Sequence, residues 1–224
     1  MRIAYTSDLH RGISEETHGI HQKFFEKLAD EHVDVIVLAG DLGTSKFDHF
    51  KGLLKHIRQV IPYTDIVAVR GNHDLWDKHT YNLRQLLKKG EETFERYNIF
   101  HLEKGVFIKG NVAIIGWDGW YYNPNPMTND KYWMPDHVGG ADIHYYLNRR
   151  AHRKFEEVLE RLDQHKDKVR VTVTHMPPFE DEDTSHHFNA DPLYISFLEG
   201  NTDYLIVGHT HTHMNRSEEH TSEL

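Results

Sequence analysis

Five short motifs place acidic, imidazole and amide side chains, the types that bind divalent cations, at points spread along the chain. Each motif follows or ends an apolar run that is typical of a buried parallel strand. The carboxyl ends of such strands converge on one crevice of an open α/β sheet, where ligands bind. We therefore expect the motif side chains to meet. The motifs are Asp8-Leu9-His10, Gly40-Asp41, Gly71-Asn72-His73-Asp74, the single His175, and Gly208-His209-Thr210-His211.

Seven of these side chains are potential metal ligands with nitrogen and oxygen donors: Asp8, His10, Asp41, Asn72, His175, His209 and His211. Such a set is enough to hold two metal ions about 3.5–4 Å apart, an arrangement that hydrolyses phosphate esters. Carboxylate and imidazole donors together suit divalent cations in hydrolases. A single motif of this kind is weak, but five in order, each after an apolar strand, favour a metal centre over coincidence.

The order of the motifs resembles the calcineurin-like metallophosphoesterase family, in which DxH, GD, GNH(D/E), H and GHxH follow one another. The resemblance covers Met1 to about Asn215. It implies an α/β fold, a four-layer α/β/β/α sandwich with two central mixed β-sheets. It also implies a dinuclear metal-dependent hydrolase of phosphomonoesters or phosphodiesters, in which a metal-bridging hydroxide attacks phosphorus directly.

The same resemblance assigns the ligands residue by residue. The first ion would be held by Asp8, His10 and His211, and the second by Asn72, His175 and His209. Asp41 would bridge the two ions, since one carboxylate can bind an ion through each oxygen. Mn²⁺ suits these donors better than Mg²⁺, which favours oxygen ligands, and Fe with Zn, or Ni, are the alternatives.

The residues beside the ligands receive roles in the same way. His73 would protonate the leaving alkoxide or stabilise the pentavalent oxyanion. Asp74 would accept a hydrogen bond from the other ring nitrogen of His73 and favour its charged form. Arg70 has two interpretations: it binds a substrate phosphoryl oxygen, or it pairs with a nearby carboxylate. Many relatives carry an acid or amide where Thr44 stands, but the residue at that position is usually not an obligatory metal ligand, so we leave Thr44 out of the site.

The elements that must position these motifs alternate in type along the first half of the chain. Predicted strands span Ile3–Ser7, Asp34–Ala39, Ile66–Val69, Val106–Lys109, Val112–Gly116, Val169–Thr174 and Tyr204–Val207. Predicted helices span Ile20–His32, Phe47–Val60, Thr80–Lys88 and Ile143–Gln164. Strands and helices that alternate indicate a parallel sheet covered on both faces. The Gly110-Asn111 pair predicts a hairpin in the middle of the chain.

Two segments have no clear periodicity. Residues 116–142 are rich in aromatic residues, namely Trp117, Trp120, Tyr121, Tyr122, Tyr132 and Trp133. They form either a cap over the metals that stacks on an aromatic leaving group, or a hydrophobic cluster that tethers a long loop. The second segment, Phe179–Asn189, contains the acidic run Glu180–Asp183, for which we expect a solvated loop.

Composition narrows the class of substrate and the compartment. The chain has 224 residues, 26 Lys and Arg against 35 Asp and Glu, and a net charge of −9. Nucleic-acid binding usually relies on a basic stripe, so small phosphate esters fit this balance better. The chain has no cysteine, which excludes thiolate metal sites. A strand begins next to Met1 and the apolar runs are short, so we expect a cytoplasmic protein without a membrane partner.

The last nine residues, Arg216–Leu224, match the translation of a common sequencing-adapter start. We therefore expect one metallophosphoesterase domain over residues 1–215, a non-native tail over 216–224, and a C-terminal truncation that removes the final strands.

Other functions stay open, and within the enzyme class they include a protein phosphatase and a cyclic-nucleotide phosphodiesterase. A nuclease of the same superfamily shares the motif order, although a basic groove is not evident in the sequence. A non-catalytic scaffold with this fold is the second alternative, although such proteins can lose ligands that this chain retains.

Overall fold

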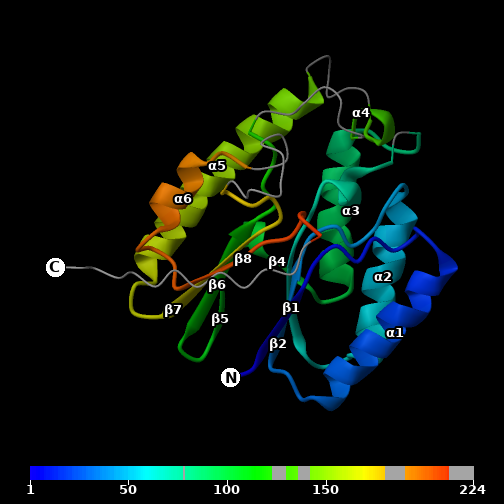
Figure 1. Ribbon diagram of the computed structural model, residues 1–224, viewed down its shortest axis with the longest axis horizontal. Coiled ribbons are helices and arrows are strands. Elements are labelled where there is room, and N and C mark those ends of the chain that lie inside the picture. The colour runs from blue at the N-terminus through cyan, green and yellow to red at the C-terminus, as the bar shows by residue number, and fades with distance from the viewer. Residues whose placement is uncertain (78, 123–129, 136–141, 180–189, 212–224) are drawn as a thin grey trace.

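The computed structural model describes residues 1–77, 79–122, 130–135, 142–179 and 190–211. These residues form two four-stranded sheets that lie between outer layers of helices (Figure 1). This is the four-layer α/β/β/α arrangement that the sequence predicts. The acidic run and the tail, with the strands expected to be missing beyond it, lie outside the described residues.

The first sheet has the strand order β1-β2-β3-β4, and every pair in it is parallel. Its strands are β1 (Ile3–Thr6), β2 (Val35–Ala39), β3 (Asp65–Val69) and β4 (Phe100–His101), joined by α1 (Glu15–Asp30), α2 (Phe47–Val60) and α3 (Leu83–Arg96). The family resemblance implies two mixed sheets, whereas the described strands of this sheet are all parallel. The reason is that a helix lies in each connection between successive strands, which lets the chain return and run in the same direction.

The second sheet is mixed. Its order is β5-β6-β7-β8, with an antiparallel β5–β6 hairpin followed by two parallel pairs. Its strands are β5 (Phe107–Lys109), β6 (Val112–Trp117), β7 (Val169–Thr174) and β8 (Tyr204–Ile206). The helices in this half are α4 (Asp130–Trp133), α5 (Ile143–Gln164) and α6 (Leu193–Leu198). In Figure 1, α5 and α6 lie on one outer side of the molecule and α1, α2 and α3 on the other.

Strand β2 shows why the sheets stack in this way. All of its residues are buried, because one face meets the helices and the other meets the second sheet. Val35, Val37 and Ala39 pack between the sheets, whereas Ile36 and Leu38 belong to the core under the helices. Burial of each larger apolar side chain contributes about 1.5–3 kcal/mol. The continuous apolar run that predicts a buried strand is therefore also what fixes the layering.

Local signals set the helix ends. The buried residues of α2 recur at helical spacing: Phe47, Phe50, Leu53, Leu54 and Ile57. Helix α3 begins three residues later than predicted, because Asn82 and Gln85 form a reciprocal capping box at its start. Strand β4 and helix α6 are not predicted from the sequence. Across the described ranges, no helix combines the length and apolar character that a bilayer crossing requires.

Candidate metal centre

The predicted ligands lie where strands of both sheets end. Strands β1, β2 and β3 of the first sheet each lead into a motif, as do β7 and β8 of the second. Distant parts of the chain thereby become neighbours. The ligands are Asp8 and His10 after β1, Asp41 after β2, Asn72 after β3, His175 after β7, and His209 and His211 after β8.

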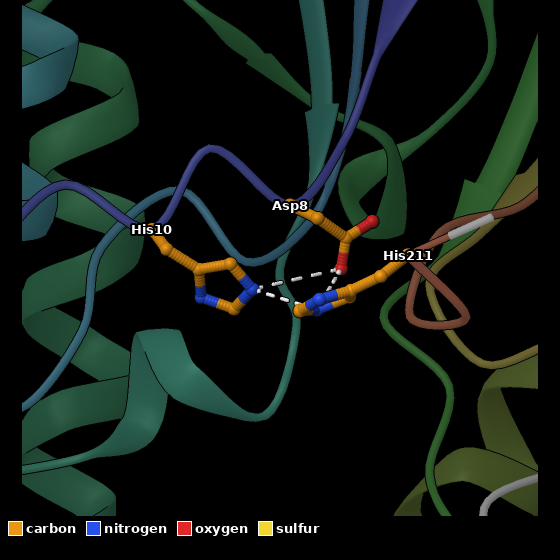
Figure 2. Close-up of side chains that lie close together, drawn as sticks. All are labelled: Asp8, His10 and His211. Atoms are coloured by element: carbon orange, nitrogen blue, oxygen red, sulfur yellow. Dashed lines mark hydrogen bonds and ion pairs between the residues drawn. The ribbon is translucent and has the colours of Figure 1, made fainter. Parts of the chain in front are cut away.

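Asp8, His10 and His211 form the outer of two donor groups (Figure 2). The Nε2 atoms of His10 and His211 lie 2.9 Å apart. Oδ1 of Asp8 lies 3.8 Å from Nε2 of His10 and 3.4 Å from Nε2 of His211. The His211 side chain is 60% exposed, so solvent reaches this group. Two imidazole nitrogens and a carboxylate oxygen that face one point fit a divalent cation.

Asp41, His175 and His209 form the inner donor group. Nδ1 of the buried His175 lies 2.8 Å from the backbone carbonyl of Ala39. A carbonyl only accepts, so Nδ1 carries the hydrogen and Nε2 is left to bind a metal. Nε2 lies 3.4 Å from Oδ1 of Asp41, and the ring of His209 is centred 5.2 Å from that of His175.

The Asp41 carboxylate lies between the two groups. Its Oδ1 faces His175 at 3.4 Å, while its Oδ2 lies 3.7 Å from Nε2 of His10 and 3.8 Å from Nε2 of His73. The backbone N–H of His73 also donates to Oδ1 at 2.9 Å, which holds the carboxylate in this orientation. Each oxygen thus faces a different group, as a bridging ligand requires.

Besides Nδ1 of His10, three buried side-chain atoms of predicted ligands have no hydrogen-bond partner among the described residues: Oδ2 of Asp41, Oδ1 of Asn72 and Nε2 of His175. Buried polar atoms in native proteins are normally paired, and leaving one unpaired costs about 1–3 kcal/mol. Two of these atoms are oxygen acceptors, and the third is the ring nitrogen that the Ala39 contact leaves available. The residues present therefore fit metal ions, which would satisfy all three.

The ligand backbone is held in the left-handed region at five of the seven positions. Their φ angles are +54° for Asp8, +44° for His10, +53° for Asp41, +71° for His209 and +55° for His211. Non-glycine residues rarely adopt this conformation, although Asp and His tolerate it better than most. Strain of this kind costs of order 1–3 kcal/mol per residue and clusters at functional sites.

Gly71 is required by the close approach of Asp41. A Cβ at position 71 would lie 2.0 Å from Oδ1 of Asp41 and 2.5 Å from its backbone nitrogen. Any side chain there would displace the carboxylate that faces both donor groups. The glycine of the Gly-Asn-His-Asp motif therefore has a packing role as well as a place in the motif.

The electrostatics favour positive charge beside Asp41 but not at His73 or His209. Burial opposes ionisation of Asp41, but the charge of His175 holds the Asp41 pKa well below the usual range. Burial opposes the charging of His175 too, and Asp41 overcomes this and raises the pKa of His175 to about 10, so that a cation bound at Nε2 would displace a proton. Burial lowers the pKa of His73 to about 4 and that of His209 to about 3. A cation would satisfy the same preference for positive charge at Asp41.

His73 faces the site with its Nε2 and is oriented by neighbours. Its Nδ1 lies 3.2 Å from Oγ1 of Thr44, and its ring stacks on Trp76 with centroids 3.5 Å apart at 23°. The sequence interpretation excludes Thr44 from the site, so this contact corrects it. Position 44, three residues after Asp41, is the signal that could have found it.

Asp74 does not hold the His73 ring as expected. Its Oδ1 accepts the backbone N–H groups of Leu42 and Gly43 at 2.9 and 2.8 Å, and its Oδ2 accepts that of Gly71 at 2.9 Å. Burial and the charge of Asp41 raise the pKa of Asp74 to about 7. Asp74 thus connects the loop after β2 to the loop after β3. Its carboxylate oxygens accept backbone N–H groups of these loops, not the ring nitrogen of His73.

Arg70 does not face the donor groups either. It is 2% exposed, and its guanidinium donates to Asp118 through Nε at 2.8 Å and to the carbonyl of Leu87 through Nη1 at 3.0 Å. The charges of Arg70 and His101 hold the pKa of Asp118 well below its usual range, although burial opposes this. The expected substrate-binding role is therefore corrected to the alternative, a buried pair with a carboxylate.

The aromatic residues of segment 116–142 do not share one environment: Trp117 is buried and Trp133 is exposed. Trp117 is fully buried against Phe155 and Tyr194, which is a core role. Trp133 is 46% exposed and lies nearly parallel to Trp76, at 14° and 6.0 Å between centroids. Since Trp76 stacks on His73, Trp133 is the aromatic residue of this segment that extends the stack toward solvent. Residues 123–129 and 136–141 lie outside the described part of the chain.

Asp130 is a second residue that the sequence does not indicate. It lies in α4, is 2% exposed, and accepts a hydrogen bond from Nδ2 of Asn72 at 2.9 Å. No pattern in the surrounding sequence marks it, because the segment has no periodicity and the contact spans 58 positions.

A family model for calcineurin-like phosphoesterases matches residues 1–213. Among curated proteins, the D subunit of the nuclease SbcCD from Staphylococcus saprophyticus is 26% identical over 190 residues, which is 79% of this chain and 46% of that protein. The chain thus spans about half the length of this relative.

Two solved structures have the same fold. The protein TT1561 of Thermus thermophilus aligns with a TM-score of 0.59 at 13% identity, covering 92% of this chain and 80% of its own. A dimetal phosphatase from Danio rerio aligns with a TM-score of 0.59 at 9% identity, covering 91% and 78%. At such identities the likeness shows the fold alone, and it agrees with the layering described above.

Proposed function

The chain belongs to the calcineurin-like phosphoesterase family, and from this membership we propose that it is a dinuclear metal-dependent hydrolase of phosphomonoesters or phosphodiesters. One observation carries the proposal: Asp41 directs one carboxylate oxygen toward each of two donor groups, and one of those oxygens is buried without a partner among the described residues. A purely structural carboxylate would be expected to have both oxygens hydrogen-bonded.

The outer group and the inner group would each hold one divalent cation. The outer ion would bind Asp8, His10 and His211, the inner ion would bind His175 and His209, and Asp41 would bind both. From the motif order of the family, the inner ion would also bind the buried Oδ1 of Asn72, which has no partner among the described residues. When bound, such ions polarise the phosphoryl group and lower the pKa of a water molecule so that it can attack near neutral pH. We propose Mn²⁺ for this mixed set of carboxylate and imidazole donors, with Fe, Zn or Ni as alternatives, because Mg²⁺ favours oxygen ligands.

His73 would act on the leaving group. The Thr44 hydroxyl can donate to Nδ1, which leaves the ring hydrogen on Nε2, the atom that faces the donor groups. The pKa of about 4 makes the ring neutral near pH 7, and from Nε2 it can donate this hydrogen to the leaving-group oxygen as negative charge develops there. Stacking on Trp76 keeps the ring in this plane, so no reorientation is needed.

Small phosphate esters are the proposed substrates, because the net charge of −9 opposes an extended polyanion. The curated relative, which is part of a nuclease, favours nucleic acid as the second candidate. Against the scaffold alternative, all seven predicted ligands and His73 are present in the sequence, and six of those ligands fall in the two donor groups. We also propose a cytoplasmic location.

Metal depletion is expected to abolish hydrolysis, and Mn²⁺ is expected to restore it. Protein stripped with a chelator would be assayed on p-nitrophenyl phosphate, bis(p-nitrophenyl) phosphate and a single-stranded oligonucleotide, before and after adding each candidate metal. Two bound ions per chain should accompany activity. Hydrolysis that persists after complete stripping, or refilled protein inactive on every substrate, would contradict the proposal. Preference for the oligonucleotide would select the nuclease alternative.

Removal of the His73 ring is expected to slow hydrolysis most for poor leaving groups. His73→Ala should lower kcat for an alkyl phosphate by about 10²–10⁴-fold, the usual contribution of a general acid, and should lower it less for p-nitrophenyl phosphate. Metal content should stay at the wild-type value. His79→Ala, which removes an exposed imidazole nearby in the sequence, serves as the control. Equal losses on both substrates would argue against proton donation by His73.

A further inference from the structure

Asp130 receives several side-chain donors at one buried carboxylate. Its Oδ1 accepts hydrogen bonds from Nδ2 of Asn72 at 2.9 Å and from Nε1 of Trp76 at 2.8 Å. Burial, the charges of Asp130 and Asp41, and a side-chain hydrogen bond with Asp130 raise the pKa of Tyr121 well above its ordinary value. Asp130 therefore joins the loop after β3 to the segment after β6, and it lies against a predicted metal ligand.

These contacts fix which way the Asn72 amide points. The indole Nε1 of Trp76 can only donate, so Oδ1 of Asp130 must be an acceptor. If the Asn72 amide were reversed, two acceptor oxygens would face each other at 2.9 Å, which is repulsive. The nitrogen end must therefore face Asp130, and the oxygen end is directed to the other side. That oxygen is buried and has no partner among the described residues.

We propose that Asp130 is a positioning residue, which holds the oxygen of Asn72 toward the inner metal ion. The inference rests on the proposed function, because it assumes that Asn72 is a metal ligand. An amide can bind a cation only through its oxygen, so an unfixed amide would present the wrong end part of the time. Partners that orient a ligand in this way typically contribute 10–100-fold to metal affinity.

Trp76 and Tyr121 extend the same arrangement to the other parts of the site. Trp76 donates to Asp130 with its edge and stacks on His73 with its face. The ring of Tyr121 lies 5.5 Å from that of His209, an inner-group ligand, in an edge-to-face arrangement. Asp130 is thus connected to Asn72 directly. It is connected to His73 through the ring of Trp76 and to His209 through the ring of Tyr121.

The test measures Mn²⁺ binding to metal-stripped protein by calorimetry. Wild type is expected to bind two ions, and Asp130→Ala is expected to bind one of them about 10–100-fold more weakly. The alanine removes the acceptor that holds Nδ2 of Asn72, so the amide can reverse. Asp191→Ala is the matched control, since it removes another buried carboxylate, one that accepts the backbone N–H of Leu193, and it should leave both affinities within two-fold. Unchanged affinities in a folded Asp130→Ala protein would overturn the inference.

A double variant separates positioning from general support of the fold. In an Asn72→Ala background, Asp130→Ala should lower Mn²⁺ affinity by less than two-fold, because the residue that Asp130 orients is gone. A full additional loss there would show that Asp130 acts by another route, against the inference. Wild-type protein that binds no Mn²⁺ at all would refute the proposed function instead, and so the two failures are distinguishable.

The wild-type protein provides a measurement that does not depend on a variant folding. The side-chain amide hydrogens of Asn72, identified by their loss in Asn72→Ala, should exchange slowly with solvent in ¹⁵N-edited spectra. Slow exchange should persist after loading with diamagnetic Zn²⁺, because the nitrogen keeps its contact with Asp130 while the oxygen binds. Exchange at the rate of a free amide in either state would overturn the inference.

Discussion

Asp41→Ala is expected to abolish phosphoester hydrolysis and to reduce bound metal from two ions to one or none. The reason is that Asp41 is the residue whose two oxygens face both donor groups, at 3.4 Å from His175 and 3.7 Å from His10. Removing it deletes a ligand from each site and the charge that favours a cation between them. We expect kcat/KM to fall by at least about 10³-fold, or about 4 kcal/mol of transition-state stabilisation. Elemental analysis and kinetics on the refilled protein measure both effects.

Two comparisons make this result specific. Asp48→Ala removes an exposed acid on α2 and should leave turnover and metal content unchanged. Asp41→Asn keeps an acceptor for the backbone N–H of His73, so it should preserve the loop while still losing activity. Wild-type turnover in refilled Asp41→Ala protein would exclude the bridging role. Thermal melts in chelator show whether either variant has lost its fold.

Arg70→Ala should lower the free energy of unfolding by about 3–5 kcal/mol, the usual cost of removing one partner from a buried ion pair. Arg70 is buried with Asp118, and its backbone N–H also donates to that carboxylate at 2.8 Å. Loss of the guanidinium removes the two-atom contact with the buried Asp118 and the ion pair with the buried Glu103, and leaves His101 and Arg150 as the cationic partners of Asp118. Urea denaturation of the metal-free protein measures the change. Arg70→Lys should recover only part of it, because an ammonium lacks the planar fork.

The control is an exposed pair. Lys27 lies 3.9 Å from Glu31 with its side chain 75% exposed, so Lys27→Ala should change stability by less than about 1 kcal/mol. The substrate-binding interpretation of Arg70 makes the opposite prediction, namely a raised KM in a protein of normal stability. That outcome would restore the role that the geometry argues against.

The sequence predicts the elements whose signals are local. The bounds of α2, α5 and β7 coincide with the predicted ranges, because amphipathic spacing and a run of β-branched residues specify them without help from the rest of the chain. The gathering of the motifs also follows from a local property, since each comes directly after a predicted strand. Strand β4 has two residues and α6 has six, too short for a periodic signal, so neighbouring elements decide them.

The choice of partner within the site is beyond the reach of the sequence. Residue type favours chemical roles for Asp74 and Arg70. In the structure, however, Asp74 accepts a backbone N–H from another loop, and Arg70 donates to the carboxylate of Asp118. Thr44 and Asp130 escape prediction for the converse reason, since their types are ordinary and only the fold brings them to His73 and Asn72. Such pairings depend on which donors and acceptors the fold places within hydrogen-bond distance, and this is a property of the tertiary structure.

Each donor group takes members from both sheets: Asp8 and His10 from the first with His211 from the second, and Asp41 from the first with His175 and His209 from the second. A cation in either group would therefore cross-link the two halves of the sandwich non-covalently. By mass action, whatever loosens the contact between the halves must weaken ion affinity, and ion loading must resist their separation. The concentration of free metal ions would then affect the stability of the folded protein as well as its hydrolytic activity.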